Sequence, residues 1–179
     1  VMRGLDVLKR HRVEFNTLTV VQRHNASAPL EIYQFLKSIG SRFLQFIPIV
    51  ERVARRETPD GLRLVGPDAD VAARVSPWSV EPGQWGAFLC AIFDEWVRHD
   101  VGQTYVQLFD VALESWLGIP QSLCVFGETC GSALVLEHNG DVYSCDHYVY
   151  PPNRLGTILE QSLDTMLQSA QQVRFGDDK

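Results

Sequence analysis

The pattern of apolar and polar side chains in the first fifty residues predicts two strands separated by a helix. Residues 13–21, VEFNTLTVV, alternate apolar and polar side chains and are rich in β-branched residues, which is typical of a strand. Residues 43–50, FLQFIPIV, are almost continuously apolar, as expected of a parallel strand covered on both faces. Apolar residues at helical spacing from Leu30 to Ile39 predict a helix between them. A strand, a helix and a strand in this order form a βαβ unit, so the predicted fold class is α/β with a parallel sheet.

A long amphipathic helix is predicted from about residue 81 to residue 98. Its apolar residues fall at helical spacing: Trp85, Phe88, Leu89, Ile92, Phe93 and Trp96. Cys90 lies beside this stripe with no second cysteine at ligand spacing, so we expect it to be a small buried hydrophobic residue. A short strand over residues 105–108 and a short helix over residues 109–117 follow.

The last third of the chain predicts a hairpin and a final helix. Asn139 and Gly140 separate two alternating runs, residues 133–137 and 141–145, and Asn-Gly in that position is a strong hairpin signal. Apolar residues on one side of residues 159–173 predict the helix.

Residues 52–76 break every period with prolines, glycines and aspartates, so we expect a long loop or insertion there. Arg52, Arg55 and Arg56 could form an anion-binding patch in this segment, but a solvated loop edge is the more common reason for such a cluster.

Composition and charge narrow the classes of function. Hydrophobic residues make up 45% of the chain and charged residues 21%, which excludes disorder and coiled coil and is typical of a globular protein. The net charge of −6 argues against a nucleic-acid partner, because phosphate contacts need clustered Lys and Arg. No apolar run reaches the length of about 18 residues that a membrane helix needs, and no signal peptide is visible. We therefore expect no membrane association and a reducing, cytoplasmic setting.

Three cysteines lie close together in the sequence, on predicted loops and hairpin ends. Cys124 and Cys130 are separated by five residues, and Cys130 and Cys145 by fourteen. In a cytosolic protein, grouped loop cysteines favour metal ligation or catalysis over disulfides. Neither spacing is the Cys-x2-Cys that zinc prefers, while iron–sulfur clusters accept irregular spacings of thiolates. An iron–sulfur cluster, a zinc site and unligated structural thiols all stay open from spacing alone.

Polar residues next to the third cysteine could carry proton chemistry. Asp146 follows Cys145 directly, so its carboxylate is a candidate general base. An aspartate after a strand is more often a turn former. His138 and His147 could be ligands, although exposed hairpin histidines are common without any such role.

The residues around Cys145 resemble a known family. GDVYSCDHYV at residues 140–149, followed by RLGTI at residues 154–158, resembles the entrance to the cysteine-rich SPASM domain of anaerobic sulfatase-maturing enzymes, which are radical SAM proteins. That family has a cysteine, a spacer, G-x4-C and then L-G-N-I, and Thr157 stands where Asn is usual. VEFNTLTVV, FLQFIPIV and FDEW at residues 93–96 resemble the second half of the family's barrel.

The resemblance implies a fold and a division of the chain. The fold would be part of a partial (β/α)6 radical SAM barrel with parallel strands, followed by a β-hairpin and a helix from the start of the SPASM domain. Residues 1–53 would form the second half of the barrel and residues 54–76 a loop or insertion. Residues 77–118 would form a bridge that consists of a helix, a short strand and a second helix. Residues 119–179 would form a truncated SPASM, or auxiliary-cluster, region.

The resemblance also implies an activity and its partners. These enzymes oxidise a cysteine or serine of a nascent, unfolded sulfatase to Cα-formylglycine, with S-adenosyl-L-methionine (SAM) and [4Fe-4S] clusters as cofactors. An electron donor such as flavodoxin or ferredoxin would supply the reducing electrons. Whether the target is cysteine or serine cannot be read from the sequence.

Site residues follow from the same resemblance. The three grouped cysteines match three ligands of the first auxiliary cluster. Asp146 matches the carboxylate that deprotonates the substrate's thiol or hydroxyl. Val50 matches a residue that packs near the SAM adenine, and Gln45 would face the barrel lumen and touch the peptide.

Two motifs of the family do not occur in this sequence. These are the radical SAM motif Cys-x3-Cys-x2-Cys and the later SPASM cysteines. Together with Val1 in place of a start methionine, this suggests the middle portion of a longer protein, which alone would be inactive and would hold no cluster stably. Two alternatives stay open: a non-catalytic peptide-binding or regulatory module, and another SPASM peptide-modifying enzyme.

Overall fold

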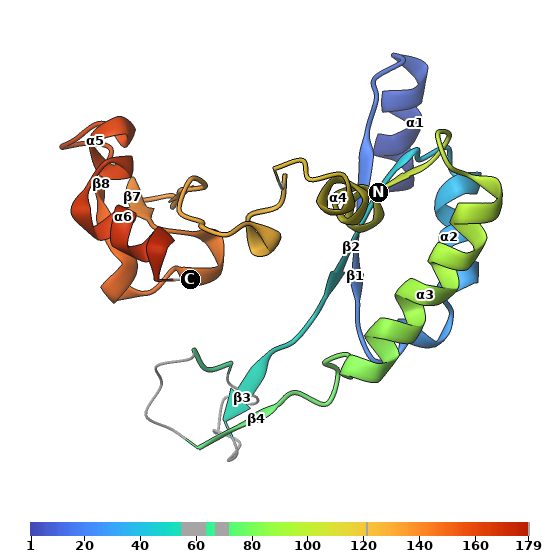
Figure 1. The fold of residues 1–179 in the computed structure, drawn as a ribbon, viewed down its shortest axis with the longest axis horizontal. Coiled ribbons are helices and arrows are strands. Elements are labelled where there is room, and N and C mark those ends of the chain that lie inside the picture. The colour runs from blue at the N-terminus through green and yellow to red at the C-terminus, as the bar shows by residue number, and fades with distance from the viewer. Residues whose placement is uncertain (55–63, 67–71, 121, 179) are drawn as a thin grey trace. The chain divides into compact units, whose positions relative to one another are not determined.

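The computed structural model describes residues 1–54, 64–66, 72–120 and 122–178 (Figure 1). The chain divides into two compact units, Val1–Ala112 and Leu113–Lys179. No helix among the described residues is long and apolar enough to cross a membrane.

A three-stranded parallel sheet organises the first unit. Strands β1 (Asn16–Val21), β2 (Phe43–Pro48) and β5 (Tyr105–Val106) lie in the order β1-β2-β5. Helix α2 (Pro29–Ser38) connects β1 to β2, and α1 (Met2–Arg10) precedes them. The predicted βαβ unit and its parallel sheet are therefore confirmed.

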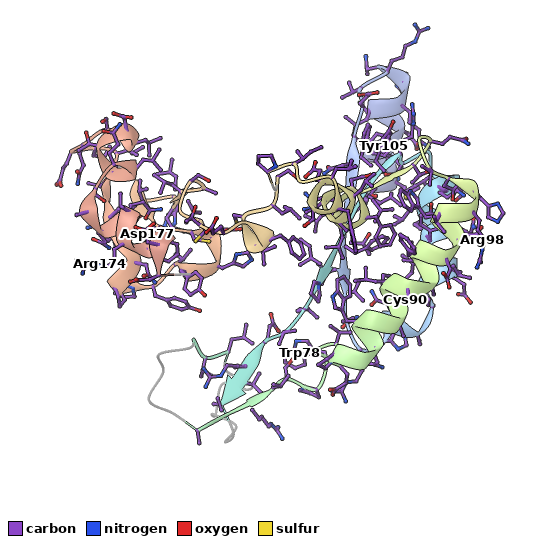
Figure 2. All side chains as sticks on the ribbon, viewed as in Figure 1. Trp78, Cys90, Arg98, Tyr105, Arg174 and Asp177 are labelled. Atoms are coloured by element: carbon purple, nitrogen blue, oxygen red, sulfur yellow. The ribbon has the colours of Figure 1, made fainter. Side chains whose placement is uncertain are left out.

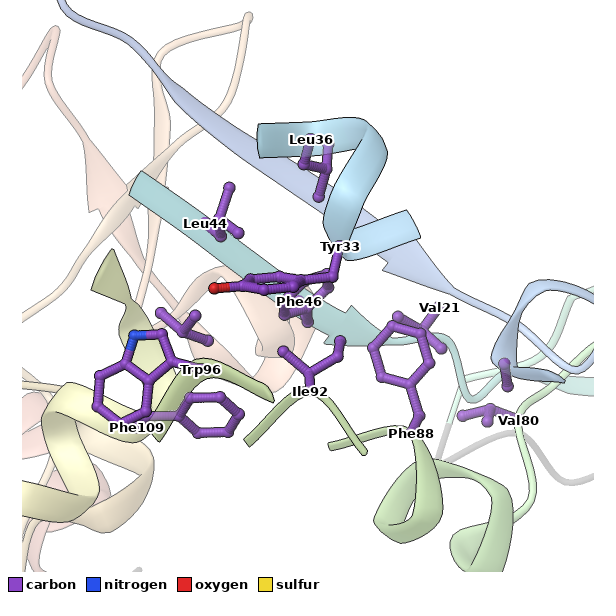
Figure 3. Close-up of a cluster of buried hydrophobic side chains, with 12 residues drawn as sticks. Val21, Tyr33, Leu36, Leu44, Phe46, Val80, Phe88, Ile92, Trp96 and Phe109 are labelled. Carbon is purple, nitrogen blue, oxygen red and sulfur yellow. The ribbon is translucent and has the colours of Figure 1, made fainter. Parts of the chain in front are cut away.

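Helix α3 (Pro82–His99) packs beside α2 and closes the core of this unit (Figure 1). The helix begins with a capping box, in which the Glu81 side chain accepts from the backbone of Gln84 and the Gln84 side chain accepts from the backbone N–H of Glu81. Side chains from β1, α2, β2, α3, β5 and α4 (Gln107–Trp116) form one apolar cluster (Figure 3). Its buried members include Val21, Tyr33, Leu36, Leu44, Phe46, Phe88, Ile92, Trp96, Val106 and Phe109.

Strand β2 is buried on one face only, which corrects the prediction of a strand covered on both. Leu44 and Phe46 belong to the core, whereas Phe43 and Ile47 are each 38% exposed. Successive strand residues point to opposite faces. The continuous apolar run therefore gives the sheet a second apolar face, which is exposed in this unit.

Residues 52–76 contain regular structure that the sequence did not predict. Strand β3 (Arg52–Ala54) pairs antiparallel with β4 (Ala73–Val75), and Val53 also bridges to Leu64. Val53 is fully buried, and its burial fixes these strands. Runs of three residues are too short to show a period, so the sequence predicted only a long loop or insertion here and not this strand pair. Arg55 and Arg56 lie outside the described residues, and the Arg52 guanidinium donates to the Gly66 carbonyl at 3.3 Å.

Cys90 is exposed, so the prediction that it is buried was wrong (Figure 2). The buried stripe of α3 runs through Phe88, Ile92 and Trp96, four residues apart. Cys90 is two residues from Phe88, which places it about 200° around the helix, on the opposite side.

A three-stranded antiparallel sheet organises the second unit. Strands β6 (Val135–Leu136), β7 (Asp141–Tyr143) and β8 (Arg154–Thr157) lie in that order. Gly140 turns the β6–β7 hairpin with φ of +91°, as the Asn-Gly signal predicts. Strand β8 was not predicted.

One predicted helix over residues 159–173 is in fact two. Helices α5 (Leu163–Leu167) and α6 (Ala170–Asp177) each begin after a serine cap, Ser162 and Ser169, whose hydroxyl accepts from a backbone N–H three residues later. Serine at a helix start satisfies an N–H that the helix leaves unpaired, so the second serine starts a new helix. Short 3-10 turns complete the chain: η1 (Asn25–Ser27), η2 (Cys124–Phe126), η3 (Asp146–Tyr148) and η4 (Pro151–Asn153).

Candidate functional site

The three grouped cysteines all lie on irregular segments of the second unit. Cys124 is the first residue of η2, and Cys145 is the N-cap of η3, just beyond the β6–β7 hairpin. Cys130 precedes Gly131, whose φ of +89° turns the chain. Cys124 is exposed, while Cys130 and Cys145 are partly buried. Their side chains can therefore be reached without unfolding the unit.

The Cys130 segment is held against the last turns of α6. The backbone N–H of Cys130 donates to the Gly176 carbonyl at 3.2 Å, and its Sγ lies 3.9 Å from the Phe175 carbonyl oxygen. Gln172 of α6 donates through Nε2 to the Gly131 carbonyl at 2.7 Å. The position of this cysteine thus depends on a helix more than forty residues later in the chain.

Cys145 lies beside two polar side chains. Its thiol donates to Asp146 Oδ1 at 3.3 Å, and His147 Nδ1 lies 3.7 Å from the sulfur. Burial raises the pKa of the Cys145 thiol. A hydrogen bond from the His147 backbone opposes that shift, and Asp146 and Cys124 add to it.

This donor set fits a metal centre of thiolates. Iron–sulfur clusters are held by cysteine thiolates, and a metal displaces the thiol proton when it binds. Three cysteines on irregular segments of one compact unit supply such ligands. Cys145, Asp146 and His147 also bring one ligand atom each within 4.8 Å of one another.

Asp146 lies at the surface of the second unit. It is the first residue of η3, its side chain is 71% exposed, and its Oδ1 lies 3.5 Å from His147 Nδ1. An exposed carboxylate can exchange a proton directly with a molecule that docks on it. His138, on the hairpin turn, has a side chain that is 92% exposed, and its Nδ1 lies 3.8 Å from Glu137 Oε2.

Gln45 and Val50 lie in the first unit, and the cysteines and Asp146 in the second. Gln45 is in the middle of β2, opposite Leu18 of β1, and between the buried residues Leu44 and Phe46. The strand alternation therefore directs Gln45 toward the sheet face away from the apolar core. Val50 follows the end of β2 and is 64% exposed.

Two polar residues near these features were missed from the sequence. Gln172 is 2% exposed and donates to carbonyls beside two of the cysteines. No pattern distinguishes it from its neighbour Gln171. Asp100, 7% exposed, is bound by Tyr33 and Lys37 of α2, and only the spacing of these two partners, one helical turn apart, hints at a shared contact.

Comparisons with known protein families identify the second unit. Residues 124–179 match the SPASM family, described as an iron-sulfur cluster-binding domain. All three grouped cysteines lie within that match.

Curated relatives match both units. The chain is 45% identical over 179 residues to the serine-type anaerobic sulfatase-maturating enzyme of Bacteroides thetaiotaomicron, covering 100% of this chain and 43% of that protein. The serine-type enzyme of Klebsiella aerogenes is 32% identical, with 99% and 40% covered. The cysteine-type enzyme of Clostridium novyi is 30% identical, with 99% and 44% covered. The chain thus spans less than half the length of these relatives.

Solved structures agree with the fold. Native anSMEcpe with bound AdoMet superposes with a TM-score of 0.78 at 27% identity, over 98% of this chain and 44% of that one. The same values for TM-score and identity hold for native anSMEcpe with bound AdoMet and Cp18Cys peptide. The predicted α/β class and the predicted family are confirmed by these matches. Over its whole length, the chain is homologous to a part of the anaerobic sulfatase-maturating enzymes, and its residues 124–179 match the SPASM iron-sulfur cluster-binding domain.

Proposed function

We propose that this chain is part of an anaerobic sulfatase-maturing enzyme, which oxidises a sulfatase side chain to Cα-formylglycine. The observation that carries the proposal is the 45% identity to a serine-type enzyme across the complete chain, through both compact units. The relative at 45% identity is a serine-type enzyme, so we propose serine as the target residue. A peptide substrate accords with the solved relative that is bound to a peptide.

The chain's own residues would divide the work between the two units. Cys124, Cys130 and Cys145 would ligate one [4Fe-4S] cluster, because their thiols lie on loops of the unit that matches the SPASM family. When bound, iron–sulfur clusters and SAM supply the one-electron chemistry of the reaction. In the first unit, Val50 would pack near the adenine of SAM, and Gln45 would hold the peptide through its amide.

Asp146 would accept the proton of the substrate hydroxyl on a carboxylate oxygen. Its exposure leaves the carboxylate open to a docking peptide, and its position next to Cys145 places the base beside a cluster ligand. A positioned general base contributes about 10²- to 10⁴-fold to a rate. The same geometry would serve a substrate thiol.

The division of the chain and its cellular partners are part of the proposal. Residues 1–53 would belong to the barrel, 54–76 to an insertion, 77–118 to the bridge and 119–179 to the cluster domain. A nascent sulfatase polypeptide would be the substrate, and a flavodoxin or ferredoxin the electron donor. The cytoplasm is the compartment that keeps such thiols reduced.

The test is formylglycine production by the anaerobically reconstituted full-length protein on sulfatase peptides that carry serine or cysteine at the target position. Mass spectrometry detects the loss of two hydrogens from the serine peptide. We expect Asp146→Asn to lower the yield about 10²- to 10⁴-fold while SAM cleavage persists. Asp164→Asn, which changes an exposed aspartate of α5 in the same unit, is the control.

Each result has a separate meaning. An unchanged yield with Asp146→Asn removes Asp146 from the base role. A preference for the cysteine peptide removes the serine assignment. Peptide binding without any product, by protein with its full iron content, favours the non-catalytic module, and a product of another mass favours a different peptide-modifying enzyme.

A further inference from the structure

Gln172 of α6 joins the segments that carry two of the cysteines. Its side-chain nitrogen Nε2 donates to the Gly131 carbonyl at 2.7 Å and to the Ser144 carbonyl at 3.1 Å. Gly131 directly follows Cys130, and Ser144 directly precedes Cys145. One amide group therefore spans two loops that are otherwise connected through the whole β6–β7 hairpin.

Where Gln172 meets the two segments, the one at Ser144 is buried and the one at Gly131 is partly buried. Ser144 is 1% exposed, and its N–H donates to the Asn153 carbonyl at 3.0 Å. On the other side, a Cβ added to Gly176 would lie 2.5 Å from the Cys130 carbonyl oxygen, so that loop rests on the bare backbone of α6. Each cysteine is thus one residue from a well-packed anchor, while its sulfur stays partly accessible.

The hydrogen bonding of the Gln172 side chain is incomplete, so its own polar groups do not explain why a glutamine is buried at this position. Both neighbours are carbonyl oxygens, so the NH2 of the amide must face them, and the Oε1 atom is left buried without a hydrogen-bond partner among the described residues. A buried acceptor without a partner destabilises a fold. An apolar side chain of similar size would avoid that cost, but it would remove the donor from both carbonyls. What it could not do is donate to both loops at once.

We propose that Gln172 is a positioning residue that sets Cys130 and Cys145 at the spacing needed for ligation of one cluster. This inference rests on the proposed function, in which both cysteines are ligands. Ligands that are held in place before the metal arrives lose less conformational freedom when it binds, so a clamp between their loops favours binding. Gln172 acts through the backbone of these loops and touches neither sulfur in the contacts described.

Gln171 provides a matched control on the same helix. Its Nε2 also donates to two backbone carbonyls, those of Pro152 at 3.2 Å and Arg154 at 3.3 Å, and neither residue is next to a cysteine. Gln171→Met and Gln172→Met therefore remove the same kind of contact from the same helix. Only the second releases the cysteine loops.

The first measurement is hydrogen–deuterium exchange on the cluster-free, reduced full-length protein. In Gln172→Met, amides of residues 129–132 and of residues 143–146 should both exchange roughly tenfold faster, because each segment loses one hydrogen bond. Gln171→Met should leave both segments unchanged. Acceleration in only one segment, or in neither, overturns the inference. If Gln172→Met fails to fold, hydrogen exchange of the wild-type protein in low urea provides the test. Two segments that Gln172 holds together must open in one step, so separate opening of residues 129–132 and 143–146 overturns the inference.

The second measurement is cluster loading of the same proteins with iron and sulfide. Gln172→Met should retain less iron and give an altered electron paramagnetic resonance spectrum, whereas Gln171→Met at equal stability should match the wild type. A purely structural role would give the two variants the same iron content and spectrum, which would overturn the inference. If the wild-type protein itself takes up no iron, the proposed function fails, and the exchange result still decides whether Gln172 joins the two loops.

Discussion

Lys37 and Asp100 form an ion pair between α2 and the end of α3 whose loss can be calculated and measured. Lys37 Nζ lies 2.7 Å and 2.6 Å from the two carboxylate oxygens, and the Tyr33 hydroxyl donates to the same carboxylate at 2.7 Å. The Asp100 side chain is only 10% exposed and that of Lys37 is 27% exposed. The perturbation is Lys37→Met, which keeps the aliphatic stem and removes the charge.

The expected cost lies between two known limits. An exposed ion pair contributes about 0.2–1 kcal/mol, while removing one partner of a fully buried pair costs about 3–5 kcal/mol because the other charge is left uncompensated. Asp100 is buried, but Lys37 is partly solvated and the Tyr33 hydroxyl still binds the carboxylate. We therefore expect Lys37→Met to lower the free energy of unfolding by about 2–3 kcal/mol at neutral pH.

The pH dependence has a definite sign. Burial raises the pKa of Asp100, but hydrogen bonds from Lys37 and Tyr33 outweigh it and hold the pKa below the ordinary value of 3.8. A depressed pKa means that the stabilisation is present above pH 3.8 and is lost as the pH falls through the folded-state value. In Lys37→Met, Asp100 loses the hydrogen bonds from Lys37, so its folded-state pKa rises. The difference in the free energy of unfolding between variant and wild type should therefore shrink as the pH falls through the wild-type folded-state pKa of Asp100.

The Tyr33 hydroxyl gives stability the opposite pH dependence, at the alkaline end. Burial, followed by the hydrogen bond to Asp100, raises the pKa of the Tyr33 hydroxyl above its ordinary value of 10.0. A raised pKa means that the contribution of this residue is fully present below pH 10.0 and declines above it. Between these two limits Asp100 stays ionised and Tyr33 stays protonated in the wild type, so the ion pair contributes fully there.

Urea unfolding followed by tryptophan fluorescence provides the assay. Trp96 is 6% exposed and donates to the Thr104 carbonyl, and the Thr104 N–H donates to the Asp100 carbonyl, so the probe lies in the same corner of the fold. The control is Arg23→Met, which removes a more exposed ion pair with Glu81 and should cost less than about 1 kcal/mol. An equal loss in both variants, or a Lys37→Met difference that is unchanged at pH 3, would refute the reasoning.

Two further variants test the packing of each unit. Phe88 is fully buried between α3 and the sheet, so Phe88→Ala should lower the free energy of unfolding by about 3–5 kcal/mol in the same urea assay, and a loss below 1 kcal/mol would contradict the core described. Gly176→Ala would place a methyl group 2.5 Å from the Cys130 carbonyl oxygen. Gly176→Ala should lower the free energy of unfolding by about 1–3 kcal/mol and reduce iron uptake. A Cβ at Gly83 would have nothing within 4 Å, so Gly83→Ala should cause no steric loss of stability and leave the iron content unchanged.

The parts of the fold that could be predicted are those with a long period. Helix α3 shows its apolar stripe over 18 residues, and the βαβ unit combines two strands and a helix in one readable order. Strands β3 and β4 are three residues each, so no period can be seen, and their pairing depends on contacts about twenty residues apart. The break between α5 and α6 was readable in principle, because Ser169 is a good helix cap, but the apolar residues on either side continued the helical spacing.

Within the candidate site, residues that are neighbours in the sequence could be predicted, and residues that meet only in the fold could not. Asp146 was a candidate because it follows Cys145 directly, so chain adjacency alone brings a carboxylate to a thiol. Gln172 donates to Ser144, the residue before the same cysteine, across 28 residues, and only the fold decides that this glutamine is buried while Gln171 is exposed. A cluster site therefore has two kinds of residue: ligands, which their chemistry reveals in the sequence, and the side chains that space them, which only the structure can identify. If Gln172 does fix that spacing, a sequence that keeps every cysteine could still lose the cluster by one substitution on α6.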